Sequence, residues 1–188
     1  MKYYIGVMNF FFMDGILSKA IPYCQRCPLQ HRGYALPRIN GREIMVIGEA
    51  PGEEEEKQGR AFVGRSGKLL DDWLLFMGIQ DRVWITNVVK HRPPDNRTPT
   101  EEEINACLPY LKAEISYVKP RYLFLLGRTA SSILGLDGDM KSIIKKTITE
   151  NVQFEGIRSV VFYHPSYILR TGKDPYPVLA YIRDNVFR

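Results

Sequence analysis

Long uninterrupted apolar runs are missing from this chain of 188 residues. No stretch approaches the ~18 apolar residues that a membrane-spanning helix requires. The amino-terminal MKYYIGVMNFFFMDG has one lysine before a short apolar run and no A-x-A site, so it makes a poor signal peptide. We therefore expect a soluble, intracellular protein without a membrane partner. A start at Met8 or Met13 would make residues 1–14 a loosely packed extension or a misassigned start.

Cysteine is scarce, with only Cys24, Cys27 and Cys107 in the whole chain. An odd number that includes a C-x-x-C pair, in a chain expected to be intracellular, indicates a metal site rather than a disulfide framework. Pro22 and Pro28 bracket the pair, which predicts a turn whose two sulfurs face one point.

Internal repeats, low-complexity segments and a strong charge imbalance are also missing. Hydrophobic residues make up 45% of the chain and charged residues 25%, which is ordinary for a globular protein. The length predicts a single domain, 1–188, with a substantial core. The net charge is +5, and acids gather at 53–56 and 101–103, so the remaining surface is basic enough for nucleic acid.

Hydrophobic periodicity predicts four strands that alternate with helices. The expected strands are 43–47, 83–89, 122–126 and 159–163, and the expected helices are 66–77, 101–118, 129–134, 141–147 and 176–187. Ser66 is the expected N-cap and Gly78 the expected stop of the first helix, and Thr100 with Glu103 forms a capping box. This alternation predicts an α/β protein, a parallel sheet with helices on both faces.

The stretch 44–67, IMVIGEAPGEEEEKQGRAFVGRSG, reads as a buried strand that ends in a tight loop. Ligands of open α/β sheets bind at the carboxyl ends of strands, where such loops lie. The loop acids, Glu49 and 53–56, are suited to hold a water or a ribose, and Phe62 to stack on a flat base. The competing interpretation is a solvated acidic turn followed by a buried phenylalanine.

The segment 59–66, GRAFVGRS, almost matches the phosphate loop G-x-x-x-x-G-K-[ST]. Arg65 replaces the lysine, and the acid run separates the segment from its strand. Four glutamates beside a triphosphate would repel it, so we reject this interpretation.

Side chains that can bind a ligand or transfer a proton follow three of the four expected strands. They are Glu49, Glu55 and Phe62 after the first, Asn87 and His91 after the second, and His164 after the fourth. Taken singly, a strand-end Asn is often a turn former and a His-Pro pair often a satisfied loop. Together they predict a pocket for a polar, planar ligand.

The motifs GEAPG, GRAFVG, TNVVKHRPP and HPSYILR, in this order and spacing, resemble those of the family 4 uracil-DNA glycosylases. These enzymes belong to the larger uracil-DNA glycosylase superfamily. The resemblance extends from about Gly15 to the carboxyl terminus. It implies a three-layer α/β/α sandwich around a four-stranded parallel sheet, an iron–sulfur cluster, and excision of uracil from DNA.

The resemblance also implies roles for individual residues, which we list in three groups. Glu49, Glu55 and His164 are the candidate catalytic residues; Ala50, Phe62 and Asn87 are the candidate uracil-binding residues; Tyr167 and Arg170 are candidate DNA contacts. Lys173 is a further candidate DNA contact because it follows the HPSYIL segment. In this scheme Glu55 orients the attacking water and His164 approaches the uracil O2. Tyr167 and Arg170 belong to the segment that enters the duplex beside the flipped base.

One departure from the family concerns the [4Fe–4S] ligands, which the resemblance gives as four cysteines. Cys24, Cys27 and Cys107 match, and His91 stands at the remaining position. Histidine can replace cysteine on iron, as Rieske centres show. Two alternatives stay open. One is zinc held by the three cysteines with His31 or His91, and the other is no metal at all.

These observations predict a monofunctional uracil-DNA glycosylase of base excision repair, acting as a monomer on single- or double-stranded DNA. One alternative is the same fold acting on hypoxanthine or xanthine. The other is a non-catalytic, cluster-bearing relative that binds DNA or protein. The set Glu55, Phe62, Asn87 and His164 argues against the latter, because a binding module has no evident need for all four.

Overall fold

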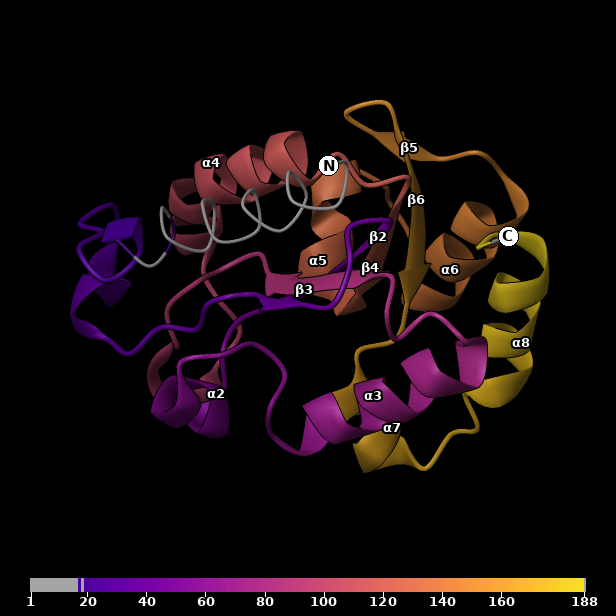
Figure 1. Cartoon of the computed structure of the whole chain (residues 1–188), viewed down its shortest axis with the longest axis horizontal. Coiled ribbons are helices and arrows are strands. Elements are labelled where there is room, and N and C mark those ends of the chain that lie inside the picture. The colour runs from indigo at the N-terminus through magenta and orange to yellow at the C-terminus, as the bar shows by residue number, and fades with distance from the viewer. Residues whose placement is uncertain (1–16, 18, 188) are drawn as a thin grey trace, which may run out of the picture.

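The computed structural model describes residue 17 and residues 19–187, which fold around one mixed sheet (Figure 1). The strand order is β1-β3-β2-β4-β6-β5. The strands are β1 (Arg38–Ile39), β2 (Ile44–Gly48), β3 (Val83–Asn87), β4 (Tyr122–Leu126), β5 (Gln153–Phe154) and β6 (Ile157–Phe162). The four central strands are parallel, as predicted, and β1 and β5 pair antiparallel at the two edges.

The prediction of a four-stranded sheet is therefore wrong by two edge strands. Each edge strand has two residues, too few for an alternation of polar and apolar residues to register in the sequence. β5 and β6 are joined by Glu155 and Gly156, both with positive φ. β1 lies in the segment 33–40, for which no strand was expected.

The parallel strands are buried along their whole length at the centre of the sheet. Every residue of β2, β3 and β4 is buried, which explains why these strands read as continuous apolar runs. β2, β3 and β4 begin side by side, because Ile44 of β2 pairs with both Val83 of β3 and Tyr122 of β4. The carboxyl ends consequently meet along one edge, where Gly48 lies opposite Asn87.

Helices cover both faces of the sheet and complete the three-layer sandwich. They are η1 (Pro28–His31), α2 (Glu53–Gln58), α3 (Arg65–Met77), η2 (Pro94–Asn96), α4 (Glu101–Val118), α5 (Gly127–Ser131), η3 (Ser132–Leu134), α6 (Met140–Thr149), α7 (Pro165–Thr171) and α8 (Tyr176–Asn185). Figure 1 shows α4 and α5 on one side of the sheet and α3 with α7 on the other. α3 packs against α7 and α8, and α6 against β6.

Helix ends agree with the capping signals at two of three places. The capping box of Thr100 and Glu103 is present, and Gly78 ends α3 in a left-handed conformation. Ser66, however, is not an N-cap, because α3 already begins at Arg65 with Gly64 as its cap. The Gly64 N–H is satisfied from outside the helix, by the Glu55 carboxylate.

The acid run, which was expected to lie in a loop, and the HPSYILR segment are both short helices. The acid run forms α2, whose first turn holds Glu53 to Glu56, where the helix dipole favours negative charge. The HPSYILR segment forms α7, with Pro165 in its first turn and His164 as N-cap. Both helices place predicted site residues on regular, better-fixed backbone.

The helices in the described part of the chain are each too short or too polar to cross a membrane. The predicted amino-terminal extension, 1–14, lies outside the described residues.

Candidate active site

A cavity of about 940 Å³ lies at the carboxyl ends of the parallel strands. Each strand contributes to its wall: Glu49 follows β2, Asn87 ends β3, Gly127 follows β4, and His164 follows β6. Ala50 lines the cavity next to Glu49. Chain connections leave β2 and β4 in opposite directions, so the cavity lies at the topological switch point, where α/β folds bind ligands.

Gly48 allows the predicted stacking ring and the predicted amide to meet. A Cβ at Gly48 would lie 2.4 Å from Cζ of Phe62 and 2.5 Å from Oδ1 of Asn87. Any other residue here would displace both side chains. The first motif therefore needs glycine at this position because Phe62 and Asn87 converge on it.

The backbone of Phe62 is held in a left-handed conformation, with φ 56°, that non-glycine residues seldom adopt. Arg38 donates a hydrogen bond to the Phe62 carbonyl and forms an ion pair with Asp71 at 2.6 Å. Gly67 approaches the same carbonyl so closely that a Cβ would lie 1.9 Å from the oxygen. These contacts fix the ring, whose centroid is 5.7 Å from that of His164.

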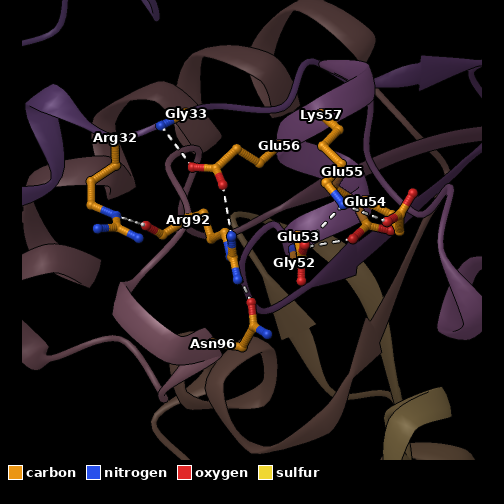
Figure 2. Close-up of polar contacts among 10 residues, drawn as sticks. All are labelled: Arg32, Gly33, Gly52, Glu53, Glu54, Glu55, Glu56, Lys57, Arg92 and Asn96. Atoms are coloured by element: carbon orange, nitrogen blue, oxygen red, sulfur yellow. Dashed lines mark hydrogen bonds and ion pairs between the residues drawn. The ribbon is translucent and has the colours of Figure 1, made fainter.

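The Glu55 carboxylate lies in the cavity wall, and both of its oxygens accept hydrogen bonds from backbone N–H groups of the surrounding loop. Oε1 accepts from the N–H groups of Val63 at 2.9 Å and Gly64 at 2.8 Å. Oε2 accepts from the N–H of Gly52 at 3.1 Å (Figure 2). Glu55 thus ties the GEAPG turn to the loop that carries the stacking phenylalanine. Its expected role in orienting water stays a prediction.

The Glu49 carboxylate bridges the switch point. Its Oε2 accepts a short hydrogen bond from the Thr129 hydroxyl, which belongs to α5 after β4. Among the described residues this is the hydrogen bond that orients Glu49, so one threonine of the helix after the neighbouring strand sets its position.

His164 is prepared as a neutral hydrogen-bond donor. Its Nδ1 accepts from the Ser166 N–H at 3.2 Å and lies 2.8 Å from the Ser166 hydroxyl oxygen. Because Nδ1 accepts, the proton of the neutral ring is on Nε2. Burial lowers the pKa of His164 to about 4, and the charge of Glu55 opposes this shift. The ring is therefore uncharged at neutral pH.

The predicted DNA contacts lie on the cavity rim and are organised around two tyrosines. The rings of Tyr163 and Tyr167 stack with centroids 5.0 Å apart. Lys173 donates to the Tyr167 hydroxyl at 2.9 Å, a bond that raises the pKa of Lys173. The guanidinium of Arg170 lies 5.8 Å from the Tyr167 ring centroid. This rim combines flat aromatic faces with exposed positive charge.

The candidate metal ligands are buried side chains at the edge of the domain. Cys24, Cys27 and Cys107 are free, buried thiols, and burial together with the neighbouring Cys24 and Cys27 sulfurs raises the pKa of Cys107. His91 is buried, and its Nε2 has no hydrogen-bond partner among the residues that the structure describes. A backbone hydrogen bond to Ile21 engages the ring. An unpartnered, buried imidazole nitrogen is the atom that a histidine ligand needs.

The described side chains also bear on the zinc alternative. Among residues 17 and 19–187, no group of three or more His, Cys, Asp or Glu side chains lies close enough to hold a metal ion. His31, the alternative zinc ligand, is exposed.

Helix α2 fastens together the segments that flank the candidate ligands (Figure 2). The Glu56 carboxylate accepts from the N–H of Gly33 at 3.0 Å and from Arg92 at 2.7 Å. Arg92 also donates to Oδ1 of Asn96, and its carbonyl accepts from Arg32. The cysteine turn and the segment after His91 are thereby joined to the loop of the cavity.

Sequence reasoning missed several residues that hold the site, namely Arg38, Lys90, Glu114, Thr129 and Ser166. Four of them act through contacts with residues distant in the chain, which no local pattern reveals. Ser166 alone had a local signal, because a Ser two residues after a helix-capping His can bond to its ring.

The fold and cavity define an α/β protein with a ligand cavity at the switch point of its sheet, lined by an aromatic ring, an amide and a histidine. A family model described as the uracil DNA glycosylase superfamily matches residues 37–184. The chain belongs to this superfamily, which confirms the resemblance.

Relatives in the same superfamily cover most of the chain. A type-4 uracil-DNA glycosylase of Thermotoga maritima is 42% identical over 159 residues, covering 82% of this chain and 82% of the relative. A type-4 uracil-DNA glycosylase of Pyrobaculum aerophilum is 40% identical over 166 residues, covering 82% and 83%. A type-5 uracil-DNA glycosylase of the same organism is 32% identical over 160 residues, covering 76% and 69%.

Proposed function

We propose that this protein hydrolyses the N-glycosidic bond between uracil and deoxyribose in DNA, leaving an abasic site for base excision repair. The observation that carries the proposal is the convergence of Phe62, Asn87 and His164 in one cavity of a superfamily member. We further propose that it works as a monomer of one domain on DNA inside the cell.

Uracil must leave the duplex before it can be bound, because the glycosidic bond of a stacked base is inaccessible. Flipping costs a few kcal/mol. Stacking on Phe62 offsets part of this cost, at ~1–3 kcal/mol for a base on an aromatic ring. The fixed backbone of Phe62 means that little ordering is needed when the base arrives.

Asn87 selects uracil over cytosine. Its amide donates to O4 and accepts from N3–H of uracil. Cytosine has a donor at N4 and a bare acceptor at N3, so both contacts would be mismatched in a buried site.

The neutral His164 stabilises the leaving group. As the glycosidic bond breaks, the electron pair stays with uracil and negative charge develops on O2. The Nε2–H of His164 donates to that oxygen more strongly in the transition state than in the ground state.

Glu49 is our candidate for the carboxylate that faces the sugar. It stabilises the cation-like sugar and accepts a proton from the attacking water, whose oxygen bonds to C1′. We prefer Glu49 to Glu55 for this role, because three backbone N–H groups already occupy the oxygens of Glu55.

We also propose that Cys24, Cys27, Cys107 and His91 hold a [4Fe–4S] cluster. When bound, the cluster supplies a rigid crosslink between segments, and base excision needs no redox step from it. The unpartnered Nε2 of His91 supports this ligand set. A neutral imidazole in place of a thiolate makes the site one charge less negative, which raises its reduction potential.

The test is incubation of the purified protein with oligonucleotides containing one uracil, hypoxanthine or xanthine, followed by alkaline cleavage. We expect strand cleavage at uracil in single- and double-stranded DNA. Cleavage only at hypoxanthine or xanthine would show that the substrate is that deaminated base rather than uracil. Intact uracil in both forms of DNA would refute the proposal.

A further inference from the structure

A buried ion pair contacts the end of β3, which carries Asn87, and is used by none of the steps above. The ammonium of Lys90 is 2.9 Å from Oε2 of Glu114, and their side chains are 2% and 0% exposed. Lys90 follows β3 by three residues, and Glu114 belongs to α4, the helix that leads from β3 to β4. Such burial of two charges calls for an explanation other than stability, since apolar replacements of buried pairs are often equally stable.

The remaining hydrogen bonds of Lys90 go to the end of β3. Its Nζ donates to the Thr86 hydroxyl at 2.8 Å and to the carbonyl of Asn87 at 2.7 Å. With Glu114 these partners use all three ammonium protons. The Thr86 hydroxyl in turn donates toward Glu114 at 3.4 Å. The carbonyl that Lys90 holds belongs to the residue whose amide reads the base.

The other end of the same residue reaches the candidate cluster site. The backbone N–H of Lys90 donates to Sγ of Cys107 at 3.5 Å. One residue therefore contacts both the peptide of Asn87 and a candidate cluster ligand, directly before His91 in the chain.

We propose that Lys90, held by Glu114, is a positioning residue that fixes the peptide of Asn87 and thereby aims its amide at uracil. The proposal rests on the proposed function, because it concerns the same pocket. Lys90 is fully engaged with protein groups, so it acts on the base only through Asn87. The buried ammonium of Lys90 makes a directed hydrogen bond to the Asn87 carbonyl, and an apolar side chain at this position could not make that bond.

The test compares two variants of the full-length holoprotein. Lys90→Met/Glu114→Leu removes both charges together with the donor to Asn87, while Glu114→Gln leaves the Lys90 donor in place. The matched control is Lys112→Met/Glu155→Leu, which removes an ion pair whose side chains are about half exposed. Four properties are measured: the melting temperature, the iron content, the steady-state kcat and KM on uracil-containing DNA, and the inhibition constant of free uracil.

We expect the Lys90→Met/Glu114→Leu variant to melt near wild type and to keep its iron. Its kcat should fall about ten- to hundredfold and its inhibition constant for uracil should rise about tenfold, with KM for DNA unchanged. Glu114→Gln leaves the buried Lys90 ammonium without its counter-ion, so its melting temperature should fall. Measured well below that temperature, its kcat should fall less than in the charge-free variant, because the Lys90 donor to Asn87 remains. The exposed control should stay within about threefold of wild type. If the first variant does not fold, Lys90→Met/Glu114→Gln replaces it under the same criteria.

A wild-type kcat and uracil inhibition in the charge-free variant would overturn the proposal. An equal loss in Glu114→Gln would also overturn it, because the pair rather than the Lys90 donor would then matter. These outcomes differ from failure of the proposed function, in which the wild-type protein itself leaves uracil in place.

Discussion

At the scale of single residues, the proposed base selection assigns the reading of uracil to the buried amide of Asn87. Asn87→Ala removes the amide and should cost ~1–3 kcal/mol in the transition state, about one to two decades in single-turnover rate. Asn40→Ala is the control, because Asn40 is exposed and its side-chain amide donates to the Gln80 carbonyl, away from the cavity. An Asn87→Ala rate equal to that of the control would remove Asn87 from the mechanism.

The protonation of His164 provides a second test at the same scale. The pKa of His164 is about 4, below its ordinary value of 6.5, so the folded protein keeps the ring neutral where the unfolded chain binds a proton. The unfolded state thus binds more protons between pH 6.5 and 4, and this group costs stability as pH falls through that window. Above pH 6.5 it contributes no pH dependence.

The measurement is a ¹⁵N NMR titration, which is tractable because the chain has three histidines. We expect the His164 ring to remain an Nε2–H tautomer down to about pH 5, and the rate of uracil excision to be insensitive to this group between pH 6 and 8. His164→Ala assigns the signal. Protonation near pH 6.5 would contradict the geometry of Nδ1 as an acceptor from Ser166.

At the scale of elements, α2 is a brace for the loop that carries Phe62. Glu55→Gln replaces a carboxylate that accepts three backbone N–H bonds with an amide that has one acceptor oxygen. We expect a lower melting temperature, a loss of ~1–3 kcal/mol in unfolding free energy, and weaker inhibition by uracil. Glu54→Gln, on the exposed side of α2, is the control. Equal stability of the two variants would show that the brace is dispensable.

The proposed cluster ligand His91 lies in the segment between β3 and α4. Protein purified without air should be brown and contain about four irons and no zinc, as a [4Fe–4S] cluster requires. His91→Ala should lose iron or become oxygen-labile, and His91→Cys should retain the cluster. His31→Ala is the control, since His31 is exposed. Four irons held as stably in His91→Ala as in wild type would exclude His91 as a ligand.

At the scale of the whole molecule, the rim of the cavity should set how binding depends on salt. The logarithm of DNA affinity should fall with the logarithm of salt concentration by roughly 0.9 per phosphate contacted. Arg170→Ala and Lys173→Ala should each flatten this slope by about one contact without changing which base is excised. Lys112→Ala, at an ion pair with Glu155, is the control. An unchanged slope in both rim variants would remove α7 from the DNA interface.

The amino-acid sequence by itself determined the layers of this molecule and the set of groups at its cavity. Five-residue apolar runs such as 44–48 and 122–126 are strands buried on both faces. Such strands can be predicted from the sequence because burial on both faces requires a continuous apolar run. Residues directly after such strands, among them Glu49 and His164, meet because parallel strands bring their carboxyl ends to one edge. The two-residue edge strands escaped prediction because they are too short for any periodicity.

Only the tertiary structure decided how those groups are held. Glu55 reads in the sequence as one more acid of a run, and its contacts with Val63 and Gly64 depend on the chain turning back through Phe62. Lys90 and Glu114 lie on different elements, and their pairing follows from the packing of α4 over the sheet. Local residue patterns record burial and turn chemistry, whereas hydrogen bonds between distant segments exist only after the layers have packed.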